Sequence, residues 1–582
     1  MLRRPIAVVT LSLLLASPAA AATSASSLTN PETPVPVQAS DAPPVGRFLS
    51  ADRVLEIAGR LPKLRSARAE YPGSYAGAYL KGTNRWQVSY FSRAGKEIGQ
   101  AIVADRTGRV LEQWTGFQIA WTMARGYRGA FGRHVNALYV WIPLCVLFFV
   151  PFFDWRHPLR LLHLDLLVLL SFSVSLAFFN HGRIDVSTPL AYPPLLYLLV
   201  RMLVLGRVRL RRARRPPAPE RPAALLIGTP WLAIALLFLV GFRVALNVTD
   251  SNVIDVGYAG VIGAQRMVQG KSLYGGYPSD NEHGDTYGPF NYAAYVPFEQ
   301  ALGFSGHWDD LPAAHGAAIC FDLLTIALLF WLGLRIRGPS MGIALAYAWA
   351  AYPFTLFTLE SNSNDTLVAV LLLAVLLVAS SAPVRGVFAA LAGLAKFAPL
   401  ALAPLFASHR LRGAPRARQA RDLALYVLAF GATVALAAVL VLGHDSLHTV
   451  YERTLVYQSK RESPFSIWGL YGASPTGGPA AHWLSSVQSA VELAAGLLAL
   501  ALALLPRRED LVGLAACATA ILIAVQLGID HWFYLYIPWF FGLAMVALLG
   551  QLSWAPAPPR SSQRAASDGA SGSARSSRLA VA

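Results

Sequence analysis

The chain contains a succession of apolar runs, each about long enough to cross a lipid bilayer. A membrane-spanning helix needs about 20 mainly apolar residues, because each residue advances the helix by about 1.5 Å. Of the 582 residues, 55% are hydrophobic and only 14% are charged, which is unusual for a soluble globular protein. The sequence therefore predicts a polytopic α-helical membrane protein.

We expect about eleven spans and one re-entrant hairpin. The expected spans are residues 136–153, 162–180, 190–206, 223–245, 313–333, 339–358, 365–380, 422–442, 484–505, 511–528 and 533–552. A further apolar segment runs from Val384 to Ala407, next to a basic loop that begins at Arg410. A full crossing by this segment would place the basic loop outside the cell, so we expect a hairpin that returns to the side it left. Gly393 and Pro399 could break its helix.

The formal net charge of +17 is carried by short basic runs between the apolar segments. Every strongly basic loop falls on one side if the N-terminal region is exported, as the positive-inside rule requires. No compact basic domain is present, which argues against nucleic-acid binding. The long polar loops Leu246–Leu311 and Gly443–His482 then lie outside the cytoplasm, together with the short loops Glu360–Asp365 and Asp530–His531.

The N-terminal region has the composition of an exported segment. Residues 1–22 combine Arg3 and Arg4 with an apolar run and small residues, which predicts a secretory signal peptide. Residues 23–47 are rich in Ser, Thr, Pro and Ala and predict a flexible linker. Residues 48–130 predict a small α+β domain, with a helix capped by Ser50 and strands that alternate in polarity. The pattern WQVSYFSRAGKEIGQAIVADRTGRVLEQWTG resembles a PepSY-type domain.

The remainder divides at its basic and polar segments. We expect a three-span module at 136–206, a basic cytoplasmic linker at 207–222, a larger membrane domain at 223–552 and a disordered cytoplasmic tail at 553–582.

The first long outside loop carries the strongest candidate for chemistry. Asp255 follows a membrane span and precedes a helical pattern that continues through Tyr258. A carboxylate at the membrane surface can take a proton from an attacking hydroxyl group, since partial desolvation raises its basicity. The alternative is that Asp255 only caps the loop helix.

Five further segments lie within about residues 230–552, in the order IDVGYAGVIGAQRMVQGKSLYG, TYGPFNYAAYVPF, ESNSND, GLAKFAPLALAPL and SPFSIWGLY. In this order they resemble glycosyltransferases of the GT-C superfamily, specifically glycosyltransferase family 87. The resemblance implies a GT-C-like membrane domain, a polyprenyl-phosphate-linked sugar donor and transfer on the extracytoplasmic face. It also implies that Asp255 is the general base.

Further candidate residues come from the outside loops and from apolar segments that contain an ionisable residue. The candidates for substrate binding are Asp250, Tyr258, Lys271, Tyr274, Tyr287, Asn291, Asp322, Asn364, Asp365, Lys396, Arg461 and His531. Asp322 could be reached from the catalytic loop or pair with another helix. Lys396 could contact a phosphate or extend to the cytoplasmic headgroups.

These patterns predict an integral glycosyltransferase of the cell (inner) membrane. It would transfer a hexose, with mannose as one candidate, from a polyprenyl phosphate to a glycan or lipid acceptor outside the cytoplasm. We expect no cofactor, because the lipid-linked sugar is itself a substrate and no nucleotide-binding motif is present. We also expect no metal ion: the group Asp280, Glu282 and Asp285 with His283 could bind a divalent cation, but such a group in a loop rich in Gly and Pro is typical of a solvated turn. The alternative function is a transporter or flippase in which Asp322 and Lys396 act near the midplane.

Overall fold

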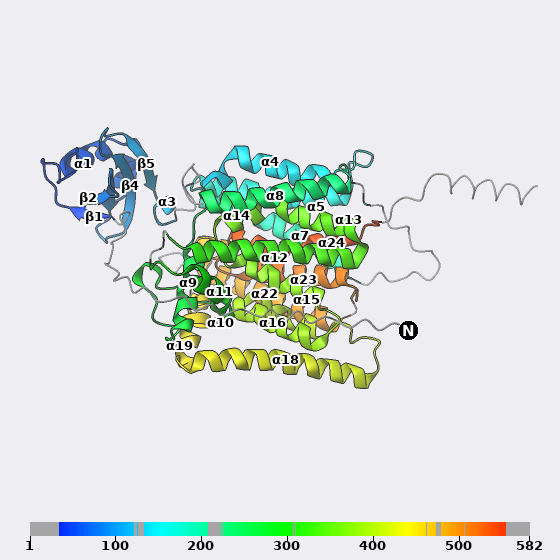
Figure 1. Cartoon of the computed structure of the whole chain (residues 1–582). Coiled ribbons are helices and arrows are strands. Elements are labelled where there is room, and N and C mark those ends of the chain that lie inside the picture. Colours follow the sequence, from blue (N-terminus) through cyan, green and yellow to red (C-terminus); the bar gives the residue numbers. More distant parts are fainter. Residues whose placement is uncertain are drawn as a thin grey trace, which may run out of the picture. The chain divides into compact units, whose positions relative to one another are not determined.

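The computed structural model describes residues 34–121, 125, 133–207, 223, 225–306, 308, 310–460, 463–472, 479–505 and 507–554 (Figure 1). The predicted signal peptide and nearly all of the predicted basic linker and C-terminal tail lie outside these residues. The chain divides into two compact units, Met1–Ile119 and Ala120–Ala582.

The N-terminal unit is an α+β domain, as the sequence predicts. Its elements are β1 (Val35–Val37), α1 (Ala51–Gly59), α2 (Pro62–Glu70), β2 (Tyr75–Lys81), β3 (Arg85–Phe91), β4 (Glu97–Ala104), β5 (Val110–Thr115) and α3 (Phe117–Ala120). The five strands form one antiparallel sheet in chain order. Ser50 caps α1 by accepting the N–H of Arg53 at 3.2 Å. Val54 and Leu64 of the helices bury against Trp86 of the sheet.

The prediction of a flexible linker at residues 23–47 is wrong for part of its described residues, 34–47. Residues Val35–Val37 pair with β2 as an edge strand. A short strand of Val and Pro is compatible with a sheet edge, where one side of the backbone needs no partner strand.

The second unit is a bundle of helices whose long members run side by side (Figure 1). The bundle helices are α4 (Leu138–Phe149), α5 (Leu161–Asn180), α6 (Ile184–Leu190), α7 (Tyr192–Gly206), α8 (Thr229–Asp250), α12 (Pro312–Arg337), α13 (Pro339–Ala351), α14 (Pro353–Glu360), α15 (Asp365–Leu377), α16 (Ala382–Ala395), α17 (Ala403–Ala407), α18 (Arg416–Leu442), α22 (Pro479–Leu504), α23 (Leu511–Gly528) and α24 (Ile537–Gly550). Shorter helices include α9 (Asp255–Val268), α10 (Pro289–Ala293), α11 (Val296–Leu302), α19 (Leu447–Tyr451), α20 (Tyr457–Lys460) and α21 (Ile467–Gly472). Figure 1 shows α9, α10, α11 and α19 together at one end of the bundle.

The predicted number of spans is not confirmed. Among the described residues, seven helices are long and apolar enough to cross a membrane, or eight if the bent pair α13–α14 is one span. That pair bends by 58° where Pro353 begins α14, because proline cannot donate the backbone hydrogen bond of a continuous helix. The predicted spans 136–153, 365–380 and 533–552 form shorter apolar helices instead.

The segment 384–407 doubles back on itself, as predicted. Its two limbs are α16 and the pair formed by η5 (Ala398–Leu402) and α17. The buried Arg385 joins the two ends, since its Nε donates to the carbonyl oxygen of Phe406 at 2.8 Å. The tip of this hairpin carries Lys396, which leaves the helix with extended backbone angles.

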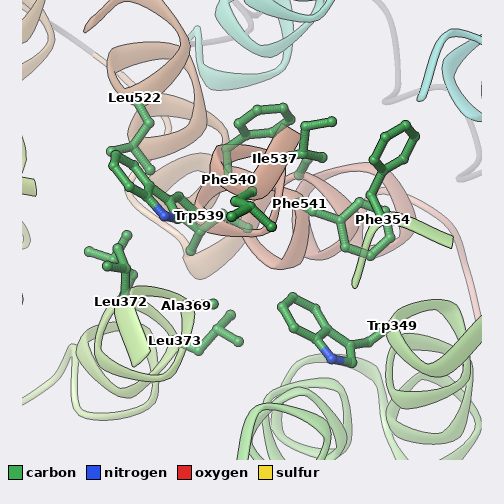
Figure 2. Close-up of a cluster of buried hydrophobic side chains, with 14 of the residues drawn as sticks. Trp349, Phe354, Ala369, Leu372, Leu373, Leu522, Ile537, Trp539, Phe540 and Phe541 are labelled. Carbon is green, nitrogen blue, oxygen red and sulfur yellow. The ribbon is translucent and has the colours of Figure 1, made fainter. Parts of the chain in front are cut away.

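The bundle core is aromatic around α24. Figure 2 shows Trp349 and Phe354 beside Phe540 and Phe541 of that helix. The Tyr352 ring stacks on Phe541 with 4.1 Å between ring centroids. This packing fixes α24 against α13 and α14, and so places the residues that precede α24.

A buried ion pair links two long helices inside the same bundle. Arg243 of α8 donates to Asp322 of α12 through Nε at 2.9 Å and through a terminal nitrogen at 2.5 Å. Trp349 Nε1 adds a third donor at 2.8 Å, and Thr355 accepts from the guanidinium at 3.3 Å. Asp322 is therefore paired with another helix, which was one of the two roles considered for it.

We predict that Asp322→Ala destabilises the protein by about 3–5 kcal/mol, because Arg243 would remain buried without its counter-ion. The measurement is thermal unfolding of the detergent-solubilised full chain. Asp185→Ala is the matched control, because Asp185 pairs with Arg183 on the exposed surface, and we expect it to leave the melting temperature unchanged. An unchanged melting temperature for Asp322→Ala would contradict the structural role of the pair.

Candidate active site

Two neighbouring cavities open at the end of the bundle that carries the short helices. The larger has a volume of about 660 Å³ and the smaller about 50 Å³. They share the lining residues Tyr287, Lys396, His531 and Tyr536. The smaller cavity also contains Asp255 and Asp365. The fold thus brings together five residues that the sequence analysis singled out from four separate segments.

Asp255 lies at the start of α9. Ile254 occupies the N-cap position, and its side chain makes no cap hydrogen bond. Asp255 is the first residue of the helix and the acidic residue of its first turn. The Asp255 side chain is exposed and lines the smaller cavity.

Tight backbone packing holds the start of α9 against the loop before α15. The N–H groups of Asn252 and Ile254 donate to the carbonyl oxygens of Glu360 and Ser361, both at 3.1 Å. Gly257 is needed here, because a Cβ atom at this position would lie 2.2 Å from the carbonyl oxygen of Asn362. This contact places Asp255 beside the segment that leads to Asp365.

Lys396 and Asp365 form the ionic centre of the site. Lys396 Nζ lies 2.5 Å from Asp365 Oδ1, and the same oxygen accepts from Trp539 Nε1 at 2.8 Å. The ammonium also lies 5.1–5.4 Å from the ring centroids of Tyr287, Tyr536 and Trp539, a geometry that attracts a cation to the ring faces. Lys396 is only 6% exposed. It does not extend toward cytoplasmic headgroups.

His531 is the second basic residue of the shared lining. Its Nδ1 lies 2.7 Å from Ser463 Oγ. The ring also neighbours Phe465, with centroids 5.6 Å apart, and Trp121, with centroids 6.2 Å apart. The contact between Ser463 Oγ and Nδ1 fixes the orientation of the imidazole ring, so that Nε2 points away from Ser463.

Asn291 and Asn364 form a buried hydrogen bond next to Asp365, the first residue of α15. Asn364 Nδ2 donates to Asn291 Oδ1 at 2.7 Å, and both residues are buried. Neither residue lines either of the two cavities described above. Within the described residues, Asn364 Oδ1 and Asn291 Nδ2 have no hydrogen-bond partner. The pair joins α10 to the start of α15, which begins with Asp365.

Four predicted substrate-binding residues from the first outside loop lie away from both cavities. Asp250 pairs with His134 at 2.5 Å. Tyr258 is buried beside Asp280, and burial is the main cause that raises its pKa to about 12. Tyr274 donates to the carbonyl oxygen of Tyr287 at 3.0 Å and so supports a lining residue. The remaining member, Lys271, is exposed.

Two predicted residues remain, of which one is paired inside the helix bundle and the other is not among the described residues. Asp322 is engaged by Arg243 and does not line either cavity. Arg461 lies outside the described residues. Of the predicted site, the structure therefore brings together Asp255, Tyr287, Asp365, Lys396 and His531.

The acidic segment of the first loop is a structural clamp. Asp285 is fully buried and accepts from Arg453 at 2.7 and 2.8 Å, and from the N–H of Gly275 at 2.6 Å. The hydrogen bond with Asp285 raises the pKa of the Arg453 guanidinium. In the described part of the chain, no group of three or more His, Cys, Asp or Glu residues is placed to hold a metal ion.

Residues 286–526 match the model of glycosyltransferase family 87. This part of the chain belongs to that family. No curated protein matches the chain. The family region contains Tyr287, Asp365 and Lys396, whereas Asp255 and His531 lie before and after it. The chain is thus a membrane glycosyltransferase whose candidate active site combines family residues with residues from flanking segments.

The sequence analysis missed several residues that line the cavities of this glycosyltransferase. They are Trp121, Gln458, Gln488, Glu492, Tyr536 and Trp539. Glu492 had a recognisable signal, because it is a carboxylate inside the apolar helix α22. The buried Arg243 of α8 carried the same signal. The aromatic residues had no such signal, since aromatic residues are common throughout the membrane segments.

The clamp between Asp285 and Arg453 leads to a prediction about loop order. Arg453→Ala leaves the buried Asp285 carboxylate without its ionic partner. We expect amide hydrogen exchange of residues 270–287 to become several-fold faster, measured by mass spectrometry on the full chain. Arg418→Ala is the control, because Arg418 pairs with Asp422 on α18 with its side chain 63% exposed. Equal exchange in the Arg453 variant and the wild type would contradict the clamp.

Proposed function

We propose that this protein transfers a hexose, with mannose as one candidate, from a polyprenyl phosphate to a glycan or lipid acceptor on the extracytoplasmic side of the cell membrane. The observation that carries the proposal is the convergence of Asp255, Lys396 and His531 on two adjoining cavities. Such a set supplies a carboxylate and two basic groups within one site. Membership of glycosyltransferase family 87 supports the reaction class.

Asp255 is the proposed general base. It takes the proton of the acceptor hydroxyl group as that oxygen forms a bond to the anomeric carbon of the donor sugar. The bond between the anomeric carbon and the phosphate oxygen breaks at the same time, and polyprenyl phosphate leaves with the electron pair. The exposed carboxylate of Asp255 within the smaller cavity supports this role, since a general base must reach the proton that it removes.

Lys396 and His531 are the proposed partners of the leaving phosphate. Cationic groups that are already in position stabilise the negative charge that develops as the glycosidic bond breaks. Asp365 and the surrounding rings hold the Lys396 ammonium in one place, which lowers the cost of ordering it when substrate binds. Asp365 is therefore a positioning residue in this proposal.

The position of the cavities relative to the apolar helices also supports a lipid-linked donor. The cavities lie where the apolar helices α15, α23 and α24 meet the polar loops. A lipid phosphate that remains anchored in the bilayer presents its sugar at this level. The distribution of basic loops supports an extracytoplasmic orientation of the same end.

Asp255→Asn tests the general base. We expect transfer to fall by about 10²–10⁴-fold, the usual contribution of general acid–base catalysis, while donor binding changes little. The measurement uses the purified full chain and membrane acceptors with two radiolabelled donors, polyprenyl phosphate mannose and polyprenyl phosphate glucose. Asp280→Asn is the control, because Asp280 lies in the same loop outside both cavities. No transfer by the wild type with either donor, or full activity of Asp255→Asn, would refute the proposal.

Lys396→Met tests the contact with phosphate. The variant keeps most of the side-chain volume and removes the charge, so we expect a loss of donor binding and of kcat together. The measurement compares KM and kcat for the donor with those of Lys396→Arg, which keeps a positive charge. Retention of wild-type kinetics in Lys396→Met would exclude this residue from phosphate stabilisation.

A further inference from the structure

The larger cavity has one wall that no step of the proposed reaction uses. This acidic wall consists of Gln488, Ser489 and Glu492 of α22 together with Asp530 from the turn after α23. Gln488 and Glu492 are four residues apart and so occupy the same face of the helix. Helices α22 and α23 pack side by side, which brings Asp530 to that face.

Direct contacts hold the acidic wall together. Gln488 Nε2 donates to Asp530 Oδ1 at 2.7 Å and to the carbonyl oxygen of Gly528 at 2.9 Å. Gly528 also allows close packing of Glu492, because a Cβ atom at residue 528 would lie 2.9 Å from Glu492 Cγ. The wall is therefore a built surface of the cavity.

The wall offers hydrogen-bond acceptors to the cavity. Both donor positions of the Gln488 amide nitrogen are used by Asp530 and Gly528, which leaves the amide oxygen as an acceptor. Glu492 is an exposed carboxylate that lines the same cavity. A carboxylate in the apolar helix α22 is costly unless water or a bound partner reaches it, and from the cavity a ligand that donates hydrogen bonds can reach Glu492.

We propose that the acidic wall binds the hydroxyl groups of an uncharged sugar ring and excludes sugars that carry a carboxylate. Sugar hydroxyl groups are donors, and they complement a surface made of acceptors. A uronic acid would instead place a third carboxylate near those of Glu492 and Asp530. This inference rests on the proposed function, because the sugar can belong to the lipid-linked donor or to the glycan acceptor.

The same charge distribution orients the substrate. The phosphate of a lipid-linked donor is repelled by the acidic wall and attracted by Lys396, which lines the same cavity. The sugar is therefore favoured at the acidic wall and the phosphate near Lys396, within the same cavity. Glu492 is a specificity-determining residue in this arrangement, whereas Asp255 remains the proposed base.

The test measures binding to the full chain in lipid nanodiscs. The donor arm uses polyprenyl phosphate mannose, glucose and glucuronic acid, and the acceptor arm uses octyl mannoside and octyl glucuronide. In at least one arm we expect the uncharged sugar to bind the wild type about tenfold more tightly than the uronic acid, a ratio typical of a like-charge contact that is partly screened. The arm that shows the difference identifies the source of the sugar.

Glu492→Gln keeps the shape of the side chain and removes its charge. We expect it to reduce the preference for the uncharged sugar several-fold, and the double variant with Asp530→Asn to abolish it. Glu452→Gln is the matched control, because Glu452 is an exposed acidic residue of η6 (Glu452–Val456) outside both cavities. Melting temperatures of all variants report whether the fold is retained.

The outcomes separate this inference from the proposed function. Equal binding of charged and uncharged sugars by the wild type, no binding of any probe, or an unchanged preference in Glu492→Gln would overturn the acidic wall as a selector. Preferential binding without sugar transfer would leave the selector standing and refute the proposed reaction. Sugar transfer without any preference for uncharged sugars would support the proposed reaction and refute the selector.

Discussion

The ion pair between Lys396 and Asp365 is the contact on which the arrangement of the site depends. It joins the tip of the hairpin formed by α16, η5 and α17 to the first residue of α15. Trp539 binds the same carboxylate oxygen and brings in the start of α24. Burying two charges is costly unless they are paired and hydrogen-bonded, so this interaction requires three segments to meet at one point.

Two buried ion pairs of the bundle have different surroundings. Arg243 and Asp322 are enclosed by α8, α12 and α13, and every contact recorded for them is within the helix core. Lys396 and Asp365 are equally buried as residues, but they also line a cavity. A charge pair that borders a cavity can exchange part of its contact for a ligand, whereas one enclosed by packed helices cannot.

The site also draws on segments outside the family region. Asp255 and Trp121 precede residue 286, and His531 follows residue 526. Tight packing supports their positions: Gly257 lies against the backbone at Asn362, and Ser463 binds the His531 ring. The family region therefore supplies the hairpin and the lysine at its tip, and the flanking segments complete the lining of the smaller cavity.

The sequence by itself determined the membrane character, the α+β form of the N-terminal domain and the hairpin at 384–407, and it singled out Asp255, Lys396 and His531, which the structure places in the cavity linings. These properties follow from local patterns, namely apolar length, charge between spans and polar motifs after helices. The sequence did not determine which helices reach full membrane length or which polar residues face the cavity. Asp322 and Lys396 both sit in apolar runs, and Asp250 and Asp255 share one loop. Only the tertiary structure showed which member of each pair lines a cavity. Whether a side chain packs against another helix or faces a cavity depends on contacts between residues that are distant in the chain.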